Sequence, residues 1–340
     1  MDRETDAASP AVPPTMTAWR QHRYGGPEAV APEEVAVPAP VRGQVLLRVR
    51  ATAINAGDTL VMRGVPLIVR LAFGLRRTRR STPGMDVAGT VVAVGPEVTG
   101  FVVGDEVVGE LPGGGLAPYT LAPVARLVER PAAVDAVAAA SLPIAAGTAQ
   151  QALDLAAAPE GGRILVIGAS GGVGTFAVQL AVAAGLEVWA LTGARSIDLV
   201  SGLGASQVFD YRTVAPGSAA LPAGSFDGVL DIAGAAPLRV LKRLVRDGGR
   251  LVLVSGKGGR VLGPIGRLLS APILSLGSRR SIRGLAATPR PAMLRDHLAL
   301  VAAGRVVPVI ERTFPLEDAR AALAHVDAGH TVGKVVVVAG

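Results

Sequence analysis

The chain has no cysteine, and aromatic residues make up only 3% of its 340 residues. Without cysteine it can form no disulfide, no thiolate nucleophile and no cysteine-ligated zinc site. The shortage of aromatic residues means that its cores must be built from alanine, valine and leucine, as in a parallel sheet covered by helices. At this length we expect two domains with cores of their own.

Long hydrophobic runs are missing as well. No uninterrupted apolar stretch reaches the roughly 18 residues that a membrane-spanning helix requires. The first six residues are mostly charged or polar, and no apolar core of a secretory signal follows them. We therefore expect a cytoplasmic protein without a membrane span.

Lysine is rare, so arginine supplies most of the 34 basic residues, which outnumber 27 acidic ones. Two clusters stand out, Arg76–Arg80 and Arg279–Arg283. They are explained either as solvated loop charge or as a means of attracting an anionic substrate or cofactor. Neither cluster is interleaved with aromatic residues, so we do not expect a nucleic-acid partner.

Residues 163–174 are the most informative segment, because an apolar strand runs into a glycine-rich turn and then into a helical pattern. Such a turn presents the free N–H groups and the positive dipole end of a helix to a diphosphate. Alanine replaces the first glycine of the usual dinucleotide fingerprint. The alternative is a turn that binds nothing. The predicted cofactor loop consists of Ala169, Ser170, Gly171, Gly172, Val173 and Gly174.

The end of the next strand, 187–192, predicts which dinucleotide binds. An NAD site places a carboxylate here to hold the ribose 2′-hydroxyl, and this strand end has none. Thr192, Gly193 and Arg195 are found instead, and a guanidinium suits a 2′-phosphate. Arg195 could also be an ordinary solvated arginine. We expect NADPH rather than NADH.

The pattern divides the chain into four parts. Residues 1–14 are predicted to be a disordered tail, and residues 15–137 a mainly antiparallel, barrel-like domain. Strand–helix alternation over residues 138–284 predicts a doubly wound α/β unit, and residues 285–340 return to the first domain. Predicted strands are 44–49, 87–94, 102–108, 163–168, 187–192, 207–210, 227–232, 250–255 and 334–338, and the later predicted helices are 291–303 and 316–328.

Several motifs, taken in order, resemble those of the zinc-independent medium-chain dehydrogenases and reductases. The resemblance is to the quinone oxidoreductase and zeta-crystallin group, nearest to the branch of reticulon-interacting reductases often described as NAD(P)-dependent alcohol dehydrogenases. It implies a GroES-like substrate domain, a Rossmann domain, an active site between them and a homodimer. The motifs are Tyr24-Gly25-Gly26-Pro27, Asn55-Ala56-Gly57-Asp58, Gly84-Met85-Asp86, Gly104-Asp105-Glu106-Val107, the glycine loop and Gly333-Lys334-Val335-Val336.

We predict no metal site. Zinc-dependent relatives hold the metal with cysteine and histidine, whereas the matching positions here offer the thioether of Met85 and the single carboxylate of Asp86. We expect Asp86 to be a structural loop acid. The histidines lack the spacing of metal ligands and are expected at the surface or in packing; they are His22, His297, His325 and His330.

The resemblance also implies roles for single residues. Asn55 and Asp58 would face the nicotinamide as catalytic residues, although Asn55 could be structural and Asp58 could merely fix a loop. Thr148 would contact the cofactor or cap its helix. Tyr211 would contact the adenine side or pack a loop. Lys334 would approach the cofactor or remain in solvent.

Three further residues lie at the carboxyl ends of predicted strands, where sheets of this kind bind ligands. Gly234 follows the fourth strand of the α/β unit, and Ser255 and Gly256 follow the fifth. We expect all three to line the cofactor crevice.

We predict an NADPH-dependent oxidoreductase that transfers a hydride to a quinone or an α,β-unsaturated carbonyl, with a cleft that orients the acceptor. No side-chain acid is evident, and solvent can protonate the product. The alternatives are reduction of an aldehyde, a ketone or an enoyl thioester, and an NADPH-binding partner protein with little catalysis.

Overall fold

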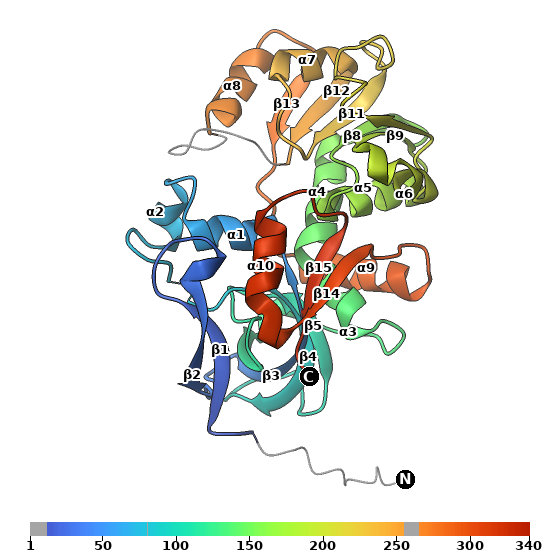
Figure 1. Ribbon diagram of the computed structural model, residues 1–340. Helices are drawn as coiled ribbons and strands as arrows, with labels where there is room; N and C mark the ends of the chain where they lie inside the picture. Colours follow the sequence, from blue (N-terminus) through green and yellow to red (C-terminus); the bar gives the residue numbers. More distant parts are fainter. Residues whose placement is uncertain (1–11, 80, 255–264) are drawn as a thin grey trace, which may run out of the picture.

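The computed structural model describes residues 12–79, 81–254 and 265–340, which form two large sheets and the helices that cover them (Figure 1). Most of the predicted tail and the predicted cofactor residues Ser255 and Gly256 lie outside these ranges.

The seven-stranded sheet belongs to the β-rich part of the molecule, and residues from both ends of the chain build it. Its order is β14-β15-β3-β4-β5-β7, with β6 also pairing with β3, and a separate ribbon joins β1 to β2. Neighbouring strands are antiparallel except β14 and β15. The strands are β1 (Thr15–Gln21), β2 (Val30–Ala36), β3 (Gln44–Ile54), β4 (Asp86–Val94), β5 (Glu106–Glu110), β6 (Tyr119–Pro123), β7 (Leu127–Glu129), β14 (Ile310–Pro315) and β15 (Lys334–Val338).

One strand of this sheet was predicted to begin too early. We expected a strand from residue 102, but β5 begins at Glu106, and Val102 and Val103 are exposed. The carboxylate of Asp105 accepts a hydrogen bond from the Val102 N–H, and Gly104 has a φ of +100°. This turn, which the two valines concealed, holds the preceding residues out of the sheet.

The six-stranded sheet is parallel throughout, with the order β10-β9-β8-β11-β12-β13. This is the doubly wound Rossmann order, so the predicted fold class is confirmed. β12 begins at Val245, earlier than predicted, and β13 was not predicted. The strands are β8 (Arg163–Ile167), β9 (Glu187–Thr192), β10 (Gln207–Asp210), β11 (Phe226–Asp231), β12 (Val245–Leu253) and β13 (Ser281–Gly284).

The two later predicted helices are present as α9 and α10, whereas α8 was not predicted. None of the helices within the described ranges is both long and apolar enough to cross a bilayer. The α-helices are α1 (Ala56–Arg63), α2 (Val69–Phe73), α3 (Ala136–Ala140), α4 (Pro143–Ala156), α5 (Gly172–Ala183), α6 (Ile197–Gly202), α7 (Leu238–Leu244), α8 (Ile265–Ser275), α9 (Pro291–Ala302) and α10 (Ala319–Asp327).

One of the hydrophobic clusters of the core runs from one sheet to the other, and further clusters lie within each part. The cluster that joins the two sheets includes Ala51 and Ala88 of the antiparallel sheet, the alanines of α4, Phe176 of α5 and Val166 of β8. Small side chains let α4 and α5 pack closely, as the composition predicted. The chain is therefore packed continuously at the junction between the sheets, and a parallel bridge between Gly171 and Gly333 joins them there.

Candidate cofactor and active site

The glycine loop connects β8 to α5 at the carboxyl edge of the parallel sheet. α5 has twelve residues, begins at Gly172 and takes Gly171 as its N-cap. The loop is tied to the other sheet, because the Gly333 N–H donates to the Ser170 carbonyl at 2.7 Å. The first turn of α5 therefore meets β15 at the junction of the two sheets, with the geometry expected of a diphosphate cradle.

The three glycines of this loop differ in what an added Cβ atom would meet. A Cβ on Gly174 would lie 2.2 Å from the Gly168 carbonyl oxygen, and one on Gly172 would lie 2.9 Å from Cδ of Lys334. At Gly171 the nearest atom is 3.6 Å away. Close packing against the backbone thus requires glycine at 174, and a Cβ at 172 would displace the Lys334 side chain, whereas the open side of the loop is at Gly171.

A groove of about 460 Å³ opens beside the loop, at the ends of β9 and β10. It holds the predicted Ser170, Gly193 and Arg195, and Tyr211 with 49% of its surface exposed. None of its nine lining residues is acidic; they are Ser170, Gly193, Ala194, Arg195, Ser196, Tyr211, Arg212, His330 and Thr331. The groove therefore offers cationic side chains and a half-exposed ring to an anionic ligand.

Arg195 is positioned by contact across the groove, since one of its Nη atoms donates to the carbonyl of His330. Arg212, which we had not singled out, has its guanidinium carbon 5.8 Å from the centre of the Tyr211 ring. Thr192 behaves differently from expectation: it is buried, and its hydroxyl finds no hydrogen-bond partner within the described structure. The charged residues, rather than Thr192, face the groove.

Thr148 lies in the interior of α4, which begins at Pro143 after the N-cap Leu142. The alternative that Thr148 caps this helix is therefore wrong. Gly234 adopts a φ of +66°, and its N–H donates to the carboxylate of Asp231 at 2.9 Å. The positive φ of this turn explains why residue 234 is glycine, and the Gly234 N–H is already hydrogen-bonded within the protein.

The other end of the junction brings together residues from three adjacent strands. Val335 on β15 is opposite Ile54 on β3, and Ala53 on β3 is opposite Asp86 on β4. The ends of these strands therefore place Lys334, Asn55 and Asp86 beside one another. All three side chains are buried, and Lys334 is only 3% exposed. The alternative of a solvated lysine is wrong.

Hydrogen bonds join these three side chains into one cluster. The Lys334 ammonium donates to Oδ1 of Asn55 at 2.5 Å and lies 3.5 Å from Oδ2 of Asp86. The Asn55 amide donates to the same Asp86 oxygen at 2.9 Å. The other Asp86 oxygen accepts from the N–H of Ile144 in the first turn of α4. Asp86 thus links three strands and a helix, a larger role than that of a loop acid.

Asp58 is committed to the backbone. One carboxylate oxygen accepts from the Asn55 N–H at 2.8 Å, and the other accepts from the Gly84 N–H at 3.1 Å. This geometry favours the loop-fixing interpretation of Asp58 over a direct catalytic one. The Gly84-Met85-Asp86 motif drew attention to Asp86 in the sequence. We expected only a structural loop acid there, and the hydrogen bonds to Asn55 and Ile144 were not predicted.

Burial changes the acid–base properties of the cluster. It raises the pKa of Asp86 to about 7, against the opposing effect of the Lys334 ammonium. Burial also raises the pKa of Asp58 and lowers the pKa of Lys334. Desolvation therefore disfavours the charged form of each of these three groups.

The cluster does not fit a metal ion. Asp86 is engaged with Asn55, Lys334 and a helix N–H, so the lysine ammonium already supplies the positive charge. Elsewhere in the described ranges, no group of three or more histidine, cysteine or acidic residues is placed to hold a metal. We therefore derive no chemical step through zinc.

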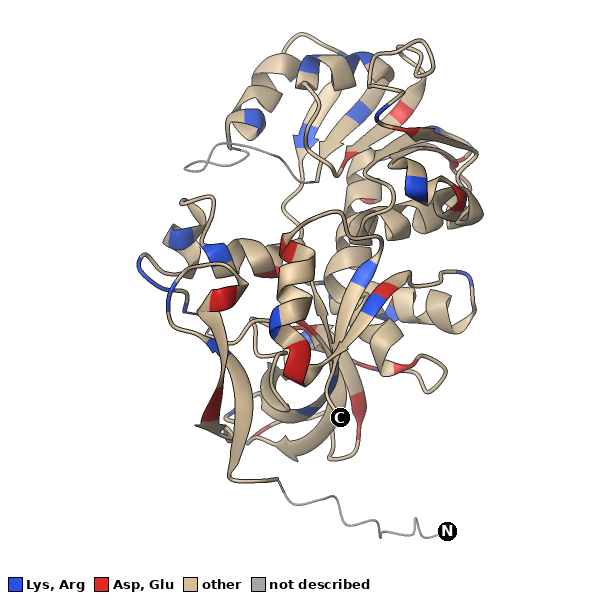
Figure 2. Cartoon of the chain, in the orientation of Figure 1, with Lys and Arg blue, Asp and Glu red and all other residues tan. Residues whose placement is uncertain are grey.

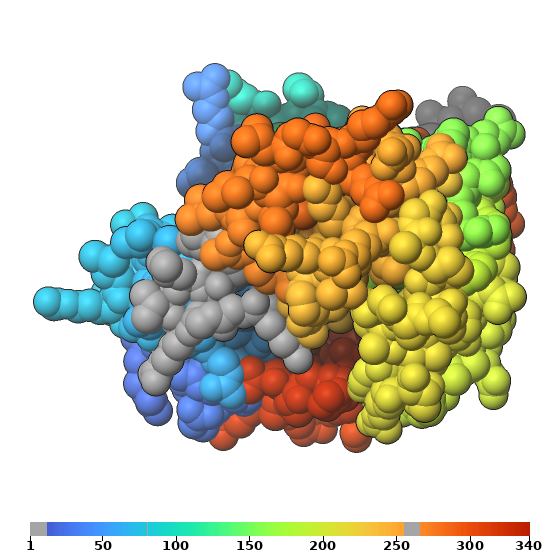
Figure 3. Space-filling model, turned by 90° about the horizontal axis from the view of Figure 1, so that it is seen from above, coloured from blue at the N-terminus to red at the C-terminus, as the bar shows by residue number. Residues whose placement is uncertain are grey.

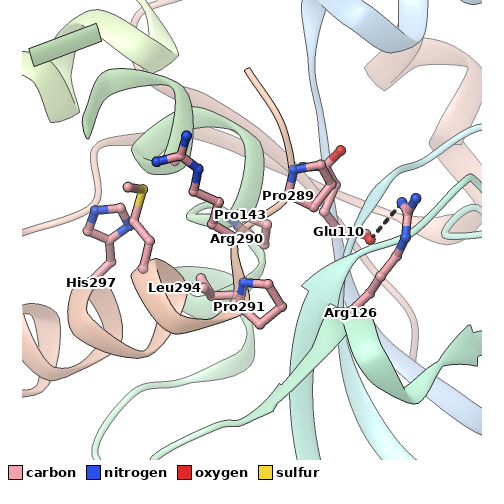
Figure 4. Close-up of a pocket in the computed structure, with 10 residues that line it drawn as sticks. Glu110, Arg126, Pro143, Pro289, Arg290, Pro291, Leu294 and His297 are labelled. Carbon is pink, nitrogen blue, oxygen red and sulfur yellow. Dashed lines mark hydrogen bonds between the residues drawn. The ribbon is translucent and has the colours of Figure 1, made fainter. Parts of the chain in front are cut away.

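A second, separate pocket lies where α9 approaches α4 and β5 (Figure 4). Its volume is about 10 Å³, enough for roughly one water molecule. His297 of α9 lines it, with both ring nitrogens unpartnered in the described structure, and burial lowers the pKa of this histidine to about 4. A neutral, packed imidazole agrees with the expectation for His297.

Two protein-family models match this chain, one in each of its parts. The model of the alcohol dehydrogenase GroES-like domain matches residues 41–132, and that of the zinc-binding dehydrogenase matches residues 203–337. The second description names zinc, which the residues at the cluster do not fit.

Relatives match almost the whole chain. The chloroplast envelope quinone oxidoreductase homolog of Arabidopsis thaliana is 36% identical, covering 95% of this chain and 98% of the relative. The chloroplastic NADPH-dependent alkenal/one oxidoreductase of the same plant is 30% identical, covering 97% and 81%. The solved structure of the quinone oxidoreductase from Coxiella burnetii has a TM-score of 0.82 at 26% identity, covering 95% and 99%. Because both plant relatives are named for the chloroplast, a cytoplasmic location stays a prediction.

Proposed function

This chain belongs to the quinone oxidoreductase group of the medium-chain dehydrogenases and reductases and is an oxidoreductase, and we propose that it transfers a hydride from NADPH to a quinone or an α,β-unsaturated carbonyl. The observation that carries the cofactor assignment is the acid-free groove beside the glycine loop. The printed names of the relatives support the two acceptor classes.

Each part of the crevice has a proposed task toward the cofactor. The N–H groups at the start of α5 hold the diphosphate, and the open backbone at Gly171 admits it. Arg195 and Arg212 bind the 2′-phosphate, while the half-exposed Tyr211 ring supports the adenine. We assign Thr148 and Lys334 to the nicotinamide end of the crevice, and Gly234 to the turn after β11 at the carboxyl edge of the parallel sheet.

When bound, reduced nicotinamide supplies the hydride for the reaction. The Asn55–Lys334–Asp86 cluster holds a positive charge beside the glycine loop, where it favours negative charge that develops on an acceptor oxygen. Asn55 keeps the ammonium in place, and Asp58 fixes the loop that carries Asn55. The acceptor gains one hydride and one proton from solvent, so a quinone becomes a hydroquinone.

Turnover with a small panel of acceptors tests the proposal. NADPH oxidation should be fast with a benzoquinone, a naphthoquinone or an unsaturated ketone, and slow with a saturated aldehyde or an enoyl thioester. Turnover limited to saturated carbonyls or to enoyl thioesters would replace the proposed acceptor class. Tight NADPH binding without turnover on any acceptor would favour a nucleotide-binding partner protein.

We also propose a homodimer formed through β13, the terminal strand of the parallel sheet as described. A strand at the edge of a sheet has backbone groups free to pair with a second copy. Light scattering of the purified protein checks this, and a monomer at micromolar concentration would contradict it.

A further inference from the structure

Two segments of the chain concentrate positive charge without any acidic residue. Residues 59–85 contain six arginines, and residues 248–295 contain eight arginines and one lysine. Together they hold 15 of the 34 basic residues and none of the 27 acidic ones, so the rest of the chain is net acidic. The positive charge of this protein is therefore segregated rather than spread.

One helix from each basic segment lies on the same side of the molecule. α2 belongs to the first segment and α8 to the second, and both lie on this side in Figures 1 and 3. In Figure 2 both helices carry basic residues and no acidic ones. The tertiary fold thus collects charge from segments almost 200 residues apart in the sequence.

Apolar side chains project from the same two places. On α8 and just after it, Leu269, Ile273 and Leu276 recur at helical spacing and are 67%, 74% and 86% exposed. The opposite side of this helix buries Ala271 against the parallel sheet. Leu71 and Leu75, in and after α2, are similarly exposed. Exposed apolar residues grouped in this way indicate an interaction surface.

Exposed arginines flank these apolar side chains. Arg76 and Arg77 follow Leu75 directly, and Arg79 is close behind them; Arg279 follows Leu276 by three residues. Arg267 has a different role, since it is paired with the buried Asp231. Among the residues that the structure describes, Arg76, Arg77, Arg79 and Arg279 form no ion pair with an acidic side chain, so their positive charges stand beside the exposed leucines.

We propose that the exposed apolar and arginine side chains of residues 71–79 and 269–279, here called the basic apolar face, dock on the surface of an anionic phospholipid bilayer. Arginines bind the anionic headgroups while the leucines and Ile273 enter the headgroup boundary. Charge and exposure alone support this docking. If the proposed function holds, docking also brings the enzyme to lipophilic quinones.

Charge favours a bilayer over the other occupants. A second copy related by a two-fold axis would set this face against itself, arginines opposing arginines. Nucleic acid would satisfy the arginines but not the exposed leucines, and none of the exposed side chains of the face is aromatic. An anionic lipid surface complements both kinds of side chain at once.

Sedimentation with vesicles tests the proposal with the whole chain. The protein should bind vesicles of phosphatidylcholine containing about 30% phosphatidylglycerol, bind pure phosphatidylcholine far less, and release as salt is raised. Replacing two arginines, Arg76→Gln with Arg77→Gln, should weaken the partition coefficient about 25-fold. The apolar variant Leu269→Ser, Ile273→Ser, Leu276→Ser should weaken it about tenfold.

Matched controls remove the same kinds of group elsewhere. Arg42→Gln with Arg305→Gln removes two exposed charges, and Val102→Ser with Val103→Ser removes two exposed apolar side chains. Both controls should keep binding within about twofold of the wild type. Quinone turnover without vesicles should be unchanged in all four variants, which separates this inference from the proposed function.

Three results would overturn the inference. One is the absence of vesicle binding by the wild type at low salt. Another is an equal loss in the variants of the face and in the controls, which would show a general charge effect. The last is that the Leu269 triple variant turns a dimer into a monomer without a change in vesicle binding, which would make the face a subunit contact.

Discussion

The two ends of the candidate crevice handle charge in opposite ways. In the groove, Arg195 and Arg212 are in contact with solvent, and Tyr211 is half exposed. In the cluster, Lys334, Asn55 and Asp86 are buried and bonded to one another. Solvated charges can select a ligand with little effect on the fold, whereas dehydrated charges depend on every partner remaining in place. Substitutions in the cluster should therefore change the stability of the protein, whereas substitutions in the groove should change ligand selection.

The largest expected effect is that of Lys334→Met. It removes the cation that opposes the desolvation of Asp86, so the buried carboxyl must take up a proton or stay charged and unpaired. Breaking a buried pair in this way costs about 3–5 kcal/mol in the free energy of unfolding. Arg195→Met, at the solvated end, should change the same quantity by less than about 0.5 kcal/mol. Urea unfolding of both variants measures the contrast.

The double variant Lys334→Met, Asp86→Asn is the control for this explanation, because it removes both charges. It should recover part of the lost stability. If the single Lys334→Met variant proves as stable as Arg195→Met, the cluster is not held by its charges and the contrast between the two ends fails.

The second largest effect that we expect is the pH dependence of stability caused by the buried Asp86 carboxyl. Burial raises the pKa of Asp86 from 3.8 in the unfolded chain to about 7. Between these values the folded state binds more protons than the unfolded state, so the contribution of Asp86 to stability falls as the pH rises. Relative to Asp86→Asn, the wild type should lose stability between about pH 4 and 7, and the difference should level off above that.

Comparing the two proteins at each pH removes the effect of other groups. His297, whose pKa burial lowers to about 4, contributes a slope of opposite sign below pH 6.5, and it does so in both proteins. Chemical denaturation across the pH range provides the difference curve. A flat difference would mean that Asp86 is ionised in both states.

A substitution that disturbs packing in the glycine loop should have an effect of intermediate size on stability. In Gly174→Ala the added Cβ would lie 2.2 Å from the Gly168 carbonyl oxygen, so α5 must move away from the turn. We expect a loss of about 1–3 kcal/mol in stability together with weaker binding of NADPH. Gly202→Ala is the matched control, because a Cβ there meets no atom within 4 Å on helix α6.

Gly202→Ala should stabilise the protein by up to about 1 kcal/mol and leave cofactor binding unchanged. Thermal unfolding and a fluorescence titration with NADPH measure both properties. If Gly174→Ala bound NADPH as tightly as the control, the backbone of this turn would not be part of the cofactor site.

How much the sequence predicts depends on how local the determinant is. The glycine loop could be predicted because strand, turn and helix are contiguous, and the strand end carrying Arg195 follows about 20 residues later. The cluster could not, since Asn55 and Lys334 are 279 residues apart and meet only through the register of β15 on β3. Burial of Lys334 is likewise a tertiary property.

The errors within the fold have the same origin. α8 and β13 were not predicted because their segment is rich in glycine, arginine and serine, and they depend on packing against β12 and α7. Val102 and Val103 were assigned to a strand because valine favours strands, but the Asp105 turn overrides that preference. Arg212 was missed because nothing in the local sequence shows which side of Tyr211 faces the groove.

The smallest effect we expect is on cofactor choice at the solvated end. Arg195→Ala should raise the Kd for NADPH about five- to tenfold, because one charge-assisted contact to the 2′-phosphate is lost in a solvated groove. The Kd for NADH, which lacks that phosphate, should change by less than about twofold. Arg305→Ala, an exposed arginine outside the groove, is the control.

The salt dependence completes this comparison. If the groove selects by solvated charge, the preference for NADPH in the wild type should shrink as ionic strength rises, and Arg195→Ala should show a weaker dependence. Equal losses of NADPH and NADH affinity in Arg195→Ala would mean that Arg195 acts through its bond to the His330 carbonyl, holding the groove closed rather than binding phosphate. In that event Arg212 would be the remaining cation in the groove able to distinguish the two cofactors.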